Sequence, residues 1–127
     1  MMKEKVIVAR PGEEAYVTEI IPSYENLSIL VGGPLEMTNP FDDYVAIISD
    51  ECSKLKGKMP NRMVCGTVGK RYARKGIPVD VYAGTIVIVG CGNGKFVGLS
   101  DSEIDRYMNL YKEPQFKASW LGEVSYE

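Results

Sequence analysis

The chain has 127 residues, of which 45% are hydrophobic and 25% charged, and this balance favours one globular domain over a disordered or fibrous chain. Its net charge is −2 and it contains no histidine, which excludes Ser-His-Asp triads, Cys-His pairs and histidine zinc sites. The 3 cysteines have no CxxC spacing, so we expect free thiols, no metal and no cofactor. No apolar run approaches the roughly 20 residues of a membrane span. The N-terminal apolar stretch is too short for a signal peptide, so we expect a cytoplasmic protein that does not bind membranes.

The first half of the chain predicts two strands, a short helix and two further strands. β-branched and alternating runs indicate the strands, and Pro-containing turns separate them. Ser23 is a suitable N-cap for the helix, and Gly32 can end it in the left-handed conformation that glycine tolerates. In chain order the predicted elements are strand 5–10, strand 15–21, helix 24–31, strand 35–38 and strand 44–48.

The second half predicts a sheet-forming region followed by a well-capped helix. A strand at 61–64 precedes a charged, glycine-containing loop at 66–76, and strands follow at 79–84, 85–90 and 95–99. The strand at 85–90 is β-branched and apolar on both faces, so it should be central. Ser100 and Glu103 form a capping box for a helix at 101–112. Its apolar stripe consists of Ile104, Tyr107, Met108 and Tyr111.

These elements predict an α+β fold, with one short helix and one C-terminal capped helix packed on a twisted, mostly antiparallel sheet. We expect a single domain at residues 1–114. Residues 115–127 form an apolar extension that includes Phe116, Trp120 and Val124. Such a segment should pack on the domain or on another subunit, and the second alternative predicts a homo-oligomer.

Charge is distributed unevenly along the chain. Eight basic residues and no acid lie between Lys54 and Lys75, so the remainder carries −10. A basic segment can attract a phosphate-bearing ligand, while the acidic remainder repels duplex nucleic acid. The alternative is a solvated basic loop.

Arginines suit phosphate because the planar guanidinium makes two parallel hydrogen bonds, and an aromatic ring among them can stack on a base. Tyr72 could equally be an ordinary surface tyrosine, and Arg106 could simply pair with Glu103 or Glu113. The glycines at 90, 92 and 94 superficially look like a dinucleotide motif, but a strand follows where that motif needs a helix. The predicted ligand-binding residues are Asn61, Arg62, Arg71, Tyr72, Arg74 and Arg106.

Four blocks in a fixed order resemble an uncharacterised family of small domains from phages, prophages and mobile elements of Gram-positive gut bacteria. They are Leu-Val-Gly-Gly-Pro-Leu-Glu at 30–36, Lys-Gly-Lys-Met-Pro-Asn-Arg at 56–62, Ala-Gly-Thr-Ile-Val-Ile-Val-Gly at 83–90 and Phe-Val-Gly-Leu-Ser-Asp at 96–101. The resemblance covers residues 5–114.

The general build is also similar to that of phage Thoeris anti-defence sponge proteins, which sequester cyclic ADP-ribose-type signals or cyclic oligonucleotides without degrading them. This similarity implies a non-enzymatic protein that sequesters a small nucleotide immune signal in the host bacterial cytoplasm, in a cage between subunits. Two alternatives stay open: a protein–protein inhibitor of a host defence protein, and a histidine-free nucleotide-degrading enzyme.

Overall fold

The structure, a computed structural model, describes residues 2–41, 43–65, 78–118 and 124–126. Its elements follow the chain in the order β1 (Glu4–Ala9), β2 (Tyr16–Ile20), α1 (Tyr24–Val31), β3 (Leu35–Thr38), β4 (Val45–Asp50), β5 (Pro60–Cys65), β6 (Pro78–Ala83), β7 (Ile86–Gly92), β8 (Lys95–Val97), α2 (Asp101–Tyr111), β9 (Phe116–Ala118) and β10 (Val124–Tyr126). Each element from β1 to α2 lies within a few residues of its predicted position, whereas β9 and β10 lie in the extension, for which no strand was predicted.

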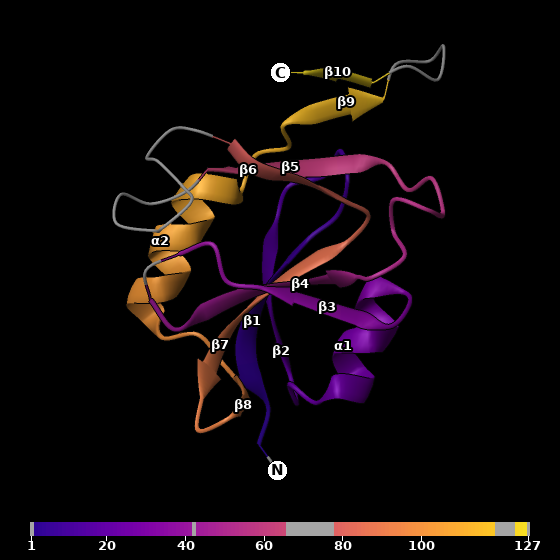
Figure 1. Cartoon of the computed structure of the whole chain (residues 1–127). Helices are drawn as coiled ribbons and strands as arrows, with labels where there is room; N and C mark the ends of the chain where they lie inside the picture. The colour runs from indigo at the N-terminus through magenta and orange to yellow at the C-terminus, as the bar shows by residue number, and fades with distance from the viewer. Residues whose placement is uncertain (1, 42, 66–77, 119–123, 127) are drawn as a thin grey trace.

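The main sheet is antiparallel and open, with the strand order β2-β1-β7-β4-β3, and β8 pairs with β7 beyond this path. The β-branched strand β7 lies in the middle, as its sequence predicts. Two further antiparallel ribbons are formed by β5 with β6 and by β9 with β10. The α+β class with an antiparallel sheet is therefore confirmed (Figure 1).

Alternation along the strands divides the core into two layers, because successive side chains point to opposite faces of a sheet. On one face, Leu27 and Val31 of α1 pack on Val6, Val8, Ala46, Ile48, Val87 and Val89. On the other face, Tyr107 and Tyr111 of α2, with side chains of the β5–β6 ribbon, pack on Ile7, Ala9, Val45, Ile47, Ile86 and Ile88. The sheet therefore lies between α1 and a layer made of α2 and the ribbon (Figure 1).

Both helices begin at the predicted caps. The Ser23 hydroxyl accepts a hydrogen bond from the amide of Asn26 at 3.1 Å, and Gly32 ends α1 with φ at 87°. In α2 the full capping box between Ser100 and Glu103 is present. The predicted stripe also faces the core, since Tyr107 is 1% exposed and Ile104 packs against the same cluster.

The turn between β7 and β8 is a tight hairpin rather than a phosphate-binding turn. Asn93 and Gly94 have φ of 53° and 76°, and two consecutive positive φ values are typical of two-residue hairpin turns. The chain then pairs back, with Phe96 opposite Cys91. This confirms the hairpin interpretation of the three nearby glycines. Cys91 and Cys52 are free and half-buried.

The C-terminal extension starts with Gln115, whose side-chain oxygen accepts the amide of Met63 in β5 at 2.6 Å. The β9–β10 ribbon follows, beyond β5 and away from the main sheet (Figure 1). Whether it meets another subunit stays a prediction. No helix in the described ranges is long and apolar enough to cross a membrane.

Candidate functional site

Asn61, the first of the predicted ligand-binding residues, lies in the interior. It is 0% exposed, and its side-chain nitrogen donates to the carbonyl oxygens of Ala9 and Gly84, both at 2.8 Å. The amide therefore joins β5 to the ends of β1 and β6. Its donors are occupied by this chain.

Arg62 is also 0% exposed, and protein oxygens surround its guanidinium. Nε donates to the carbonyl of Tyr111 at 2.9 Å, Nη2 to the carbonyl of Glu13 at 2.7 Å and Nη1 to Oδ1 of Asn61 at 2.6 Å. Burial lowers the pKa of Arg62, and the negative charge of Glu113 opposes that change. The guanidinium ties β5 to the end of α2 and to the β1–β2 turn, and in this arrangement it is closed to a ligand.

Arg106 lies on the exposed side of α2 and pairs with an acid that the sequence analysis did not consider. Its Nη1 lies 3.2 Å from Oδ2 of Asp43, so the expected partners Glu103 and Glu113 were wrong. The Tyr107 hydroxyl donates to the same oxygen at 2.6 Å. Burial, and then this bond to a carboxylate, raise the pKa of Tyr107.

Arg71, Tyr72 and Arg74 lie outside the described residues, so the structure does not place them. The structure thus does not bring Asn61, Arg62 and Arg106 together at one surface. Arg62 and Asn61 share an interior network, whereas Arg106 belongs to an exposed pair on α2.

A cluster of charges around one buried acid was not predicted. Asp50 at the end of β4 has a fully buried side chain, and Oδ2 receives the amines of Lys56 at 2.7 Å and Lys58 at 2.8 Å. The two lysines also donate to the carbonyls of Gly32 and Val31 at the end of α1, at 3.2 and 2.9 Å. Cations are favoured at a helix C-terminus, where the backbone dipole is negative.

The charge of Asp50 is stabilised despite its burial. Burial alone would raise its pKa, but hydrogen bonds from Lys56, Lys58 and the amide of Cys52 outweigh burial and lower the pKa below its ordinary value. Because each lysine contacts both a carboxylate and a backbone carbonyl, two of the eight bases in the basic segment serve the fold.

Two glycines allow this cluster to close. A Cβ at Gly33 would lie 2.5 Å from Oδ1 of Asp50, and one at Gly84 would lie 2.6 Å from Cδ of Lys58. The blocks at 30–36, 56–62 and 83–90 therefore meet around one ion cluster.

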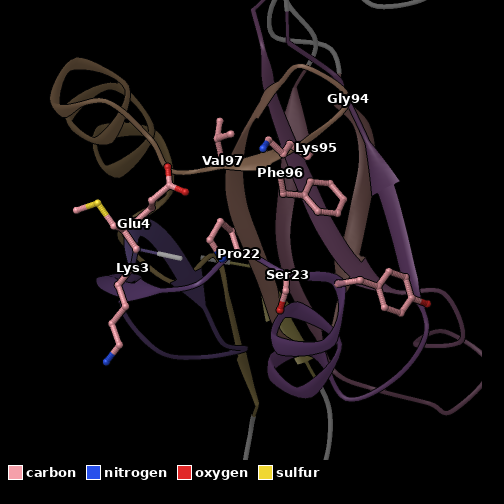
Figure 2. Close-up of a pocket in the computed structure, with 10 residues that line it drawn as sticks. Lys3, Glu4, Pro22, Ser23, Gly94, Lys95, Phe96 and Val97 are labelled. Carbon is pink, nitrogen blue, oxygen red and sulfur yellow. The ribbon is translucent and has the colours of Figure 1, made fainter.

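A hollow of about 680 Å³ lies between the β7–β8 hairpin and the start of α1. We call it the hairpin groove. It is lined by Met2, Lys3, Glu4, Pro22, Ser23, Tyr24, Gly94, Lys95, Phe96 and Val97. In Figure 2, Lys95 and Phe96 lie above Pro22 and Ser23, and Glu4 lies at the left, while the Lys3 amine extends away from them. A space of this size suits a small molecule.

The groove combines aromatic surface with charge. The Phe96 ring is half-buried, and the Tyr24 ring is 59% exposed. A second hollow, of about 260 Å³, shares Phe96 with the groove. Lys95 is exposed, and in the described part of the chain no ion pair involves it. Glu4 is held in place because Oε1 accepts the amide of Gly98 at 2.9 Å.

Sequence analysis missed this groove because no local pattern contains it. Ser23 is a helix cap and Phe96 is a hairpin residue, and each is explained by its own element. The two segments are about seventy residues apart and meet only because β8 extends the sheet past the start of α1. A phenylalanine next to a lysine in the sequence is a weak signal without that topology.

Residues 2–112 match the family described as a domain of unknown function, DUF3846. The match covers most of the 127 residues, so the chain belongs to this family. Its span agrees with the resemblance over 5–114 that the sequence blocks indicate. No curated protein and no solved structure matches the chain.

Proposed function

We propose that this member of the DUF3846 family binds a small phosphate-bearing nucleotide in the hairpin groove. The observation that carries the proposal is the combination of Phe96 with Lys95, a cation without an ion-pair partner among the described residues, across from the capped start of α1. Both residues line the groove, so an aromatic ring and a cation are available for the two ends of a nucleotide.

The base would stack on the Phe96 ring, with Tyr24 as a second ring at the same groove. Stacking of a base on an aromatic side chain contributes about 1–3 kcal/mol and tolerates any base. Phe96 lines two hollows, which leave room for a planar group near the ring.

The phosphate would lie between the Lys95 amine and the first turn of α1. The first backbone amides of a helix have no partner within the helix, and they carry partial positive charge. The Ser23 hydroxyl accepts a hydrogen bond from the amide of Asn26. The amides of the two residues before Asn26 can therefore donate to an anion. Because a small ligand has few phosphates, salt should weaken binding only modestly.

Sequestration of an immune signal is the role that we propose for this binding, on the basis of the similarity to phage sponge proteins. A protein–protein inhibitor is the second candidate, and the exposed side chains of Tyr24, Ile29 and Met37 around α1 favour it. A nucleotide-degrading enzyme is the third.

Incubation with a panel of cyclic dinucleotides, cyclic trinucleotides and cyclic ADP-ribose isomers, followed by denaturation and mass spectrometry, tests the three candidates. Recovery of an intact ligand supports sequestration, and recovery of a changed ligand supports an enzyme. Failure to bind any of the panel contradicts the proposal and favours a protein partner.

Variants locate the site by calorimetry with the ligand that is recovered. Phe96→Ala and Lys95→Ala should each weaken binding about ten- to a hundredfold, the loss expected for one stacked base or one charge-assisted contact. Lys112→Ala and Tyr44→Ala remove an exposed lysine and an exposed aromatic outside the groove, so they should bind like the parent. Parent-like binding by both groove variants would place the site elsewhere.

A further inference from the structure

The two edges of the main sheet differ in how they are protected against pairing with another strand. The β3 edge has only four residues and directly follows Pro34, whereas the second proline, Pro40, has a counterpart in Pro22, which follows β2 at the same spacing. The β2 edge has five residues, contains neither proline nor lysine, and pairs with β1 without a bulge. Short strands, prolines, lysines and bulges are the usual means of blocking an edge. By this comparison β2 is the open edge.

The side chains of β2 are distributed so that both faces can take part in a contact. Tyr16 lies opposite Val8, and Thr18 lies opposite Val6, both of which belong to the cluster under α1. Tyr16, Thr18 and Ile20 therefore lie on the α1 face. Val17 lies on the other face, and Tyr16 and Val17 are each 38% exposed.

We propose that β2 pairs antiparallel with β2 of a second copy of this chain, about a twofold axis at Thr18. In this register Tyr16 lies opposite the partner's Ile20, and Val17 lies opposite the partner's Glu19. A twofold axis makes every such pair occur twice, as a self-complementary interface requires. Pairs of an aromatic with a β-branched residue are among the favourable cross-strand pairs.

A shallow groove beside β2 supports a second copy as the occupant. This groove, of about 320 Å³, is lined by Lys3, Glu19, Ile20, Ile21, Asn26, Ile29 and Leu30. Ile29 is 72% exposed there. The partner's Tyr16, placed opposite Ile20 on the α1 face, would cover this apolar surface.

Charge agrees with the same occupant. The guanidinium of Arg10 lies 5.7 Å from the centroid of the Tyr16 ring. When the partner's Tyr16 packs on the groove, the partner's Arg10 would therefore lie close to the groove as well. The groove is lined by one acid, Glu19, and by one base, Lys3, and Glu19 provides the opposite charge. The pairing uses the β2 edge rather than the C-terminal extension, and it does not depend on nucleotide binding.

The twofold axis provides a sharp test, because Thr18 faces its own counterpart. Sedimentation velocity over a concentration series should show a dimer for the parent. Thr18→Lys and Thr18→Glu should each raise the dimer dissociation constant by about tenfold or more, since like charges would lie directly opposite each other. An equimolar mixture of the two variants should restore dimer, because opposite charges then meet at the axis. Met37→Lys on the β3 edge should leave the dimer unchanged.

The parent provides a second measurement that needs no variant. Amide hydrogen exchange at residues 16–20 should slow as protein concentration rises, while exchange at residues 35–38 should not. A parent that remains monomeric at high micromolar concentration overturns the proposal. So does a dimer that both Thr18 variants leave intact, or concentration-independent exchange at residues 16–20.

Discussion

Replacing Arg62 with methionine tests whether this arginine serves the fold or a ligand. The substitution removes the bonds to the Tyr111 carbonyl and to Oδ1 of Asn61, both buried, and those to the partly exposed carbonyls of Glu13 and Lys112. A buried acceptor left without a donor costs about 1–3 kcal/mol, so the two buried acceptors account for about 2–6 kcal/mol. Removal of a desolvated charge offsets part of this cost. We expect Arg62→Met to lower the free energy of unfolding by about 3 kcal/mol.

Equilibrium unfolding in urea measures this effect. With a slope of about 1–3 kcal/mol per M, the midpoint should fall by about 1–3 M. Arg106→Met is the matched control, because it removes an exposed guanidinium that pairs with Asp43 and should cost about 1 kcal/mol or less. An Arg62→Met protein with the parent's urea midpoint would refute the structural role. Loss of nucleotide binding in that stable variant would instead assign Arg62 to the ligand.

Two further predictions concern the ion cluster around Asp50. The folded-state pKa of Asp50 is lowered, so its contribution to stability is complete above the unfolded-state pKa of about 4 and is lost as pH falls toward the lower folded-state value. Urea midpoints measured at pH 7, 5 and 3 should therefore fall less steeply for Asp50→Asn than for the parent. Equal slopes for the two proteins would contradict this prediction. Gly33→Ala should lower the free energy of unfolding by about 1–3 kcal/mol through overpacking, because the new Cβ would lie 2.5 Å from the carboxylate of Asp50. Gly92→Ala is the control, since a Cβ there would meet nothing closer than 3.7 Å. Equal melting temperatures of the two variants would contradict the prediction and show that the cluster can shift to make room for the Cβ.

Most of the fold was predictable because its determinants are local. The Ser23 and Ser100 caps, the left-handed Gly32 and the hairpin turn at Asn93 each depend on residues a few positions apart. Periodicity likewise identified the stripe of α2 and the central strand. The arrangement of β5 and β6 as a separate ribbon over the α2 face depends on long-range contacts, which no local pattern contains.

The residues that hold a ligand could not be identified from residue type alone, because residue type does not show which partners a side chain meets in the fold. Arg62 was assigned to an anion site because of its charge and because the basic segment around it, which includes Lys58, contains no acid. Asp50 lies only a few positions before the basic segment, yet its burial at the end of β4 could not be read from a segment that looked like a polar turn. Chain folding brings this acid to Lys56 and Lys58 and offsets part of the positive charge of the segment.

The partners of a cation, rather than its type, separate structural from ligand-binding roles in this protein. A structural cation donates to buried acceptors of its own chain, as Arg62 does to Oδ1 of Asn61, and its removal must appear as lost stability. A ligand-binding cation keeps its hydrogen-bonding capacity for a partner that comes from outside, and its removal leaves stability nearly unchanged. Lys95, exposed on β8 beside the Phe96 ring, meets the second condition among the described residues. Arg62 was the first candidate for a phosphate contact because of its charge, but its donors are occupied by this chain. The proposed phosphate contact therefore falls to Lys95 in the hairpin groove.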